Sequence, residues 1–136
     1  MTTLLQQGVK AAQVRGEDRR FSVTIGAGAL EAGDIFTLTS GLAVACTDGS
    51  KIDGVLCRTG AISATNIPAW ILGDGDVWDF TVASLTADMG DKLVPAGADA
   101  LDAGTATNPS IGIIIEGAIT TAEVQARVLI QRSLIA

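Results

Sequence analysis

The sequence predicts an all-β protein: a single-domain β-barrel or β-sandwich of about ten short strands, with an N-terminal arm. Composition is the first reason. The 136 residues are 48% hydrophobic but only 4% aromatic, with 16 glycines. The apolar mass is therefore mostly small aliphatic side chains, which suit short strands and tight turns. Clean alternation of apolar and polar residues is the second reason, and an internal repeat is the third.

The repeat joins residues 32–62 and 89–119, which follow the same running order. Each opens on a Gly-Asp turn and enters a short apolar strand. Each then reaches a second strand built around a glycine, Gly54 or Gly112, and closes on Gly-Ala-Ile. A repeat of this length indicates either a true duplication or two similar hairpin units with the same turn chemistry.

The N-terminal segment differs from the rest. Residues 1–20 have a loose helical pattern of apolar residues that Gly8 and Gly16 interrupt. We expect an extended or partly helical arm over residues 1–20 and a β-barrel or β-sandwich body over residues 21–136. At 13.8 kDa the chain has room for one hydrophobic core.

Within the body, strands are expected where short apolar or alternating runs lie between turn residues. Residues 21–25 and 123–132 alternate most clearly, and Ser40-Gly41 predicts a tight hairpin. Gly73–Asp76 predicts another turn. The expected strands cover 21–25, 35–39, 42–46, 54–58, 69–72, 77–82, 92–95, 100–102, 111–118 and 123–132.

The charge is unevenly distributed. Residues 1–20 carry four basic and two acidic side chains, whereas the remaining residues carry five basic and thirteen acidic ones. An acidic body argues against nucleic-acid binding, which needs a basic surface. No apolar run reaches the roughly 18–20 residues of a membrane helix. The N-terminus lacks the basic and apolar regions of a signal peptide, so we expect synthesis in the cytoplasm and no membrane partner.

The sequence contains few residues in patterns typical of catalytic or metal-binding sites. The chain has no histidine, which removes the commonest general base and most zinc and iron sites. Cys46 and Cys57 are favoured as structural thiols over a disulfide or a reactive site. Asp74, Asp76 and Asp79 do not fit a calcium loop of the EF-hand type, which requires glycine where Asp79 stands. We therefore expect no enzyme, and no catalytic, cofactor-binding or metal-binding residues.

Two tryptophans flank the turn at Gly73–Asp76, and they are either core anchors or interface anchors. The arm has apolar and basic side chains that could dock on a partner. The residues expected to bind a partner are Leu4, Leu5, Val9, Arg15, Arg19, Arg20, Trp70 and Trp78.

Over residues 30–130 the running order of small residues and turns resembles a bacteriophage head decoration (capsid cement) protein of the small Gly/Ala-rich all-β family. The resemblance lies in short patterns of glycine, aspartate and aliphatic residues, and the long charged N-terminal segment and the two cysteines depart from it. The matching stretches are Ala32–Asp34, Gly41–Ala45, Gly54–Leu56, Gly90–Leu93, Asp102–Thr107, Ile111–Ile113 and Val124–Ile130.

This resemblance implies an oligomeric protein on the outer capsid surface of the virion. It would bind the expanded icosahedral head and bridge adjacent subunits of the major capsid protein, and it would associate with itself as a homotrimer or a dimer. The alternatives are another virion module of the tail, baseplate or head-completion type, or a small all-β hydrolase or lyase using Asp74, Asp76 and Asp79.

Overall fold

The computed structural model describes residues 10–47, 50–82, 90, 92–103, 111–119 and 125–131, and within these ranges it contains strands and no helix. The all-β prediction is confirmed. The strands are β1 (Ala11–Arg15), β2 (Arg20–Ile25), β3 (Ile35–Thr39), β4 (Leu42–Ala45), β5 (Gly54–Leu56), β6 (Ile67–Trp70), β7 (Val77–Thr81), β8 (Lys92–Pro95), β9 (Leu101–Ala103), β10 (Gly112–Ile119) and β11 (Gln125–Ile130).

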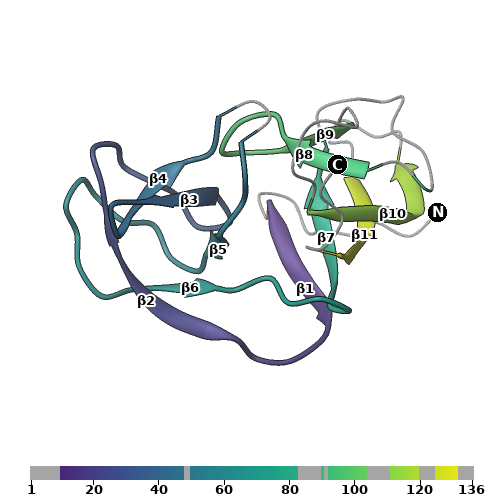
Figure 1. The fold of residues 1–136 in the computed structure, drawn as a ribbon, viewed down its shortest axis with the longest axis horizontal. Coiled ribbons are helices and arrows are strands. Elements are labelled where there is room, and N and C mark those ends of the chain that lie inside the picture. Colours follow the sequence, from purple (N-terminus) through teal and green to yellow (C-terminus); the bar gives the residue numbers. More distant parts are fainter. Residues whose placement is uncertain are drawn as a thin grey trace.

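Strands β2 to β6 form a closed barrel in the order β2-β4-β3-β5-β6. Strand β2 closes it by pairing antiparallel with β6 and, at its far end, parallel with β4. The expected hairpin between β3 and β4 is present, with Ser40 at φ 52° and Gly41 at φ 80°. Two successive residues with positive φ give the turn whose twist matches that of the flanking strands. This first barrel lies on the left in Figure 1.

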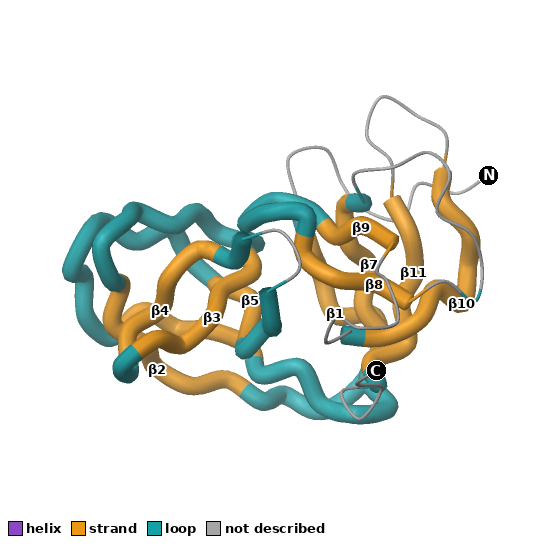
Figure 2. Tube along the Cα trace, turned by 45° about the horizontal axis from the view of Figure 1, so that its top comes forward, coloured by secondary structure: helices purple, strands orange, loops and turns teal. Residues whose placement is uncertain are grey.

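Strands β7 to β11 repeat this connectivity on the other side of the molecule. The second sheet has the order β1-β7-β11-β10-β8-β9. An isolated parallel bridge between Val82 and Leu101 links the end of β7 to β9, just as the Ile25–Ala43 pair links β2 to β4. Figure 2 shows the two rings of strands side by side. The sheet therefore curls into a second five-strand unit with β1 added outside it.

The strand registers show that the two units are equivalent residue by residue. Phe36 pairs with Gly54 in the first barrel, and Leu93 pairs with Gly112 in the second. The glycine strand then pairs onward in the same register, Leu56 with Ala69 and Ile114 with Val128. Strands β2 and β7 are also equivalent to each other, although both lie outside the repeat visible in the sequence. The two similar hairpin units are thus parts of two topologically identical halves.

Equivalent strand positions supply the buried side chains of both barrels, but the larger side chain of a pair is in the first barrel at some positions and in the second at others. The first barrel has Phe36 where the second has Leu93, while the second has Phe80 where the first has Val23. Among the described residues, seven equivalent pairs of apolar side chains are buried: Val23 and Phe80, Ile25 and Val82, Phe36 and Leu93, Ala43 and Leu101, Leu56 and Ile114, Ile67 and Ala126, Ala69 and Val128. Close packing tolerates such exchange when the total volume is kept.

The two barrels share one hydrophobic cluster, which joins them into a single body. Buried residues on the outer side of the first barrel, including Ile35, Val55 and Leu72, belong to the same cluster as Phe80 and Leu93 of the second barrel. A separate cluster fills the inside of the first barrel. Burial of apolar surface therefore stabilises the contact between the two halves, just as it stabilises the fold within each half.

The structure describes residues 10–20 of the predicted arm. Ala11–Arg15 forms β1 and pairs antiparallel with β7, from Ala11 opposite Phe80 to Arg15 opposite Val77. Ala11 packs against the shared cluster. The loose helical pattern did not prevail because the edge of β7 offers backbone hydrogen bonds that satisfy an extended segment. Residues 1–9 lie outside the described part of the chain.

The junction between the barrels and the candidate interaction surface

Lys10, at the start of β1, ties the two barrels together. Its Nζ donates hydrogen bonds to Asp34 Oδ1 at 2.6 Å and to Asp99 Oδ1 at 2.8 Å, and Glu31 Oε2 lies 3.9 Å away. Asp34 precedes β3 of the first barrel, and Asp99 lies in the loop between β8 and β9 of the second. A single ammonium group thus joins carboxylates from both halves of the molecule.

The protonation equilibria of this cluster follow from burial and pairing. Burial lowers the pKa of Lys10, but its hydrogen bonds to Asp34 and Asp99 outweigh burial and hold that pKa above its usual value. Burial raises the pKa of Asp34, although Lys10 opposes the change. The hydrogen bond from Lys10 lowers the pKa of Asp99. Lys10 therefore keeps its charge on acidification, while the two carboxylates titrate as a pair.

Two further buried carboxylates are held by arginines. Arg19 Nε lies 3.3 Å from Asp76 Oδ2, which also accepts a hydrogen bond from the N–H of Gly73. Arg127 contacts Asp79 with two hydrogen bonds, Nε to Oδ1 at 2.9 Å and Nη2 to Oδ2 at 3.2 Å. The acidic residues Asp76 and Asp79 thus serve as internal ion-pair partners in this structure.

Asp79→Asn should destabilise the fold by roughly 2 kcal/mol, because it removes a buried charge that accepts two hydrogen bonds from Arg127 while keeping the side-chain volume. The Arg127 side chain is 31% exposed, so water can solvate part of the guanidinium once the carboxylate charge is lost. Urea unfolding measures the change. Asp18→Asn, which removes an exposed ion pair with Arg20, is the matched control and should change stability little, because water screens that pair. Equal losses in the two variants would contradict the prediction.

The two tryptophans meet across the turn, as their positions in the sequence indicated. Their rings are T-shaped with centroids 5.6 Å apart, and Trp78 also stacks on Phe80. Trp78 is only 1% exposed and belongs to the shared hydrophobic cluster, so in this structure it has the first of the two roles expected for it, that of a core anchor. Trp70 is half-buried, and the Arg20 guanidinium lies 5.3 Å from its ring centroid.

Two of the three basic residues expected to bind a partner form ion pairs within the chain. Arg19 bonds Asp76 and Glu17, and Arg20 bonds Asp18. Arg15 is exposed at the end of β1. Leu4, Leu5 and Val9 fall outside the described residues. The predicted surface is therefore not assembled as one patch in the described part of the chain.

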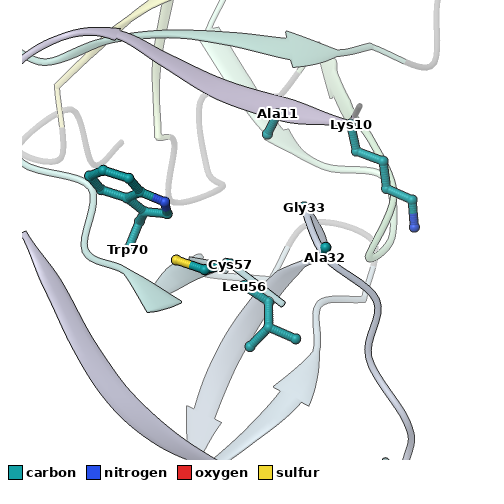
Figure 3. Close-up of a pocket in the computed structure, with 7 residues that line it drawn as sticks. All are labelled: Lys10, Ala11, Ala32, Gly33, Leu56, Cys57 and Trp70. Carbon is teal, nitrogen blue, oxygen red and sulfur yellow. The ribbon is translucent and has the colours of Figure 1, made fainter. Parts of the chain in front are cut away.

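A cavity of about 220 Å³ lies between the start of β1 and the first barrel. Trp70, Cys57 and Leu56 line one side, and Lys10 and Ala11 line the other (Figure 3). The lining is mainly apolar, and its one ionic group is the Lys10 ammonium already paired with Asp34 and Asp99. The arrangement can accommodate small apolar groups and offers no nucleophile paired with a base.

Both cysteines are free thiols, Cys46 buried and Cys57 partly buried. Burial raises the pKa of both thiols above the ordinary value of 9.0. Each thiol is therefore protonated near neutral pH, which makes it a poor nucleophile. Both cysteines therefore have the properties of structural thiols.

Stability should fall as the pH rises above about 9. In the unfolded chain the thiols ionise at their ordinary pKa of 9.0, whereas in the folded chain burial keeps them protonated to higher pH. The unfolded state therefore loses protons first and is favoured, by up to about 1.4 kcal/mol per pH unit for each thiol. Urea unfolding between pH 7 and 10.5 measures this, and Cys46→Ala should flatten the decline. A decline identical in Cys46→Ala would contradict the assignment.

Sequence reasoning missed Lys10, Asp34 and Asp99 as a cluster. The only local signal was the Gly-Asp turn that opens the repeat, because Gly33 there has φ 87° and places Asp34 against the barrel. The contact with Lys10 is non-local. Among the described residues no helix has the length and apolarity needed to cross a membrane. Comparison with protein-family models finds no match, and comparison with curated proteins finds none either.

Proposed function

We propose that this chain is a structural protein of a bacteriophage virion. It would bind the outer surface of the expanded head and bridge neighbouring subunits of the major capsid protein. The observation that carries the proposal is the pair of equivalent barrels, which share one hydrophobic cluster and the Lys10 ion pairs. The running order of small residues and turns over residues 30–130 adds to it.

The duplicated architecture suits a bridging role for a physical reason. Two halves with the same strand topology offer two places at which copies of one partner can bind. Rigid coupling between the halves transmits load from one partner to the other, so binding raises the free energy needed to separate them. Asp76 and Asp79, two of the three aspartates of the hydrolase or lyase alternative, form ion pairs within the chain, which favours a binding body over an enzyme built on these carboxylates.

Binding to purified heads tests the proposal. The protein is added to expanded heads that lack outer proteins, and to unexpanded heads as the control. We expect saturable binding at hundreds of copies per head, and a higher temperature of head disruption, for expanded heads alone. Binding without saturation, or saturation with no gain in head stability, would remove the proposed function. A few copies per particle would instead place the chain in the tail, baseplate or connector.

A further inference from the structure

The two barrels differ at one equivalent edge. In the second barrel, β7 is paired on both sides along its length, with β11 on one side and β1 on the other. In the first barrel, β2 pairs with β6 from Arg20 to Val23, but its pairing with β4 begins only at Thr24. Within the described part of the chain, no strand therefore occupies on β2 the place that β1 occupies on β7.

The direction of the hydrogen bonds shows that this edge is open for pairing. The Ile25 N–H bonds Ala64 on the β6 side, whereas the Gly26 N–H bonds Ala43 of β4. Backbone groups alternate along a strand, so those of Ser22 point away from β6. The Arg20 N–H lies on the same edge, and the Arg20 guanidinium is bonded to the Asp18 carboxylate. Ser22 is thus the central backbone position of an unpaired edge.

The solvent exposure of equivalent residues on β2 and β7 also differs between the two edges. Ser22 is exposed, while its equivalent Asp79, opposite Ala12 of β1, is 2% exposed. No ribbon runs along the outer side of the first half of β2 in the two views of the fold (Figures 1 and 2). An open edge of this kind is a template for another extended segment.

We propose that residues 1–9 of a second copy of this chain add to this edge as an antiparallel strand. The chain's own N-terminal region shows the mode, since β1 is an added strand on the equivalent edge of β7. The segment MTTLLQQGV has no charged side chain and no proline, and Thr2, Thr3, Leu4 and Leu5 are compatible with an edge strand.

Length and symmetry are consistent with exchange between copies. Nine extended residues reach about 30 Å beyond Lys10 at roughly 3.3 Å each, which exceeds the length of the four-residue edge. The contact joins two different surfaces, the N-terminal segment of one copy and β2 of the next. Such contacts close into rings when the rotation permits. The inference does not depend on the proposed function, because it needs only copies of this chain.

Amide hydrogen exchange at Ser22, together with the molar mass in solution, tests the proposal. In the full-length protein we expect an oligomer whose Ser22 amide exchanges at least about tenfold more slowly than in a variant lacking residues 1–9, which should be a monomer. Phe21 and Val23 amides point toward β6 and serve as internal controls, with unchanged protection in both proteins. On dilution, the Ser22 protection should be lost together with the oligomer.

Ser22→Pro supplies an independent test, because it removes the N–H that faces the open edge, and proline is tolerated on edge strands. It should give a monomer, while Ser22→Ala should remain oligomeric. If Ser22→Pro does not fold, the exchange experiment on the unmodified chain still decides. The proposal is overturned if Ser22 exchanges equally fast with and without residues 1–9. It is also overturned if the protection persists in a monomer, or arises only on binding to capsid heads.

Discussion

Gly112→Ala is expected to destabilise the protein by about 3 kcal/mol or more, the upper end of the usual cost of overpacking. A Cβ atom at this position would lie 2.1 Å from the carbonyl oxygen of Leu129 and 3.0 Å from its carbonyl carbon. Gly112 pairs with Ile130 and Leu93 at the same time, so β10 cannot move away from β11 without losing a pairing. Urea unfolding measures the loss.

The equivalent substitution in the first barrel, Gly54→Ala, should have an effect of similar size. Its Cβ would lie 2.5 Å from the Trp70 carbonyl oxygen and 2.7 Å from Phe36 Cζ. Gly28→Ala is the matched control, because nothing lies within 4 Å of the added atom, and it should change stability by less than about 0.5 kcal/mol. If Gly112→Ala were as stable as Gly28→Ala, the close strand contact and the equivalence of the two barrels would both be in doubt.

Trp78→Ala is expected to cost about 3–5 kcal/mol, the usual range for removing a buried aromatic side chain. The ring is 1% exposed, stacks on Phe80 with centroids 5.7 Å apart, and meets Trp70 edge to face. The surrounding β-strands are fixed by their pairings and cannot collapse into the space. Thermal and urea unfolding give the change in the free energy of unfolding.

Trp70→Ala provides the comparison for Trp78→Ala, since Trp70 belongs to the same aromatic pair but is only half-buried. It should cost clearly less, because part of its surface is already in water. Trp78→Phe, which keeps most of the apolar volume, should recover most of the loss. A larger effect at Trp70 than at Trp78 would show that the shared core is organised differently from this description.

Most strand positions could be predicted from local sequence patterns. The alternating run at Phe21–Ile25 became β2, and the Ser40-Gly41 turn joined β3 to β4 as expected. These elements depend on period-two alternation and on residues that accept positive φ, which are properties of a few neighbouring residues. The repeat also was visible, because its Gly-Asp turns and strand glycines recur in the same order.

The surface expected to bind a partner was harder to predict from the sequence. Arg19 and Arg20 were expected to face a partner, yet they pair with Asp76 and Asp18. Ala11–Arg15 was expected in an arm, yet it forms an added strand on β7. The Arg19–Asp76 pair and the pairing of β1 with β7 join groups that folding brings together from distant parts of the chain, so neighbouring residues do not reveal them. Arg20 and Asp18, by contrast, are only two residues apart.

Composition and local pattern are sufficient for an all-β chain, its turns and the existence of two related units, since backbone geometry and side-chain alternation are local effects. The closure of each unit into a barrel, the burial of Trp78 and the joining of both halves by Lys10 arise only in the tertiary structure. The reason is that strand register and ion pairing depend on which edges and charges meet after the chain has closed. The open edge of β2 is likewise a tertiary feature, recognisable only because β7, its equivalent, has a partner there.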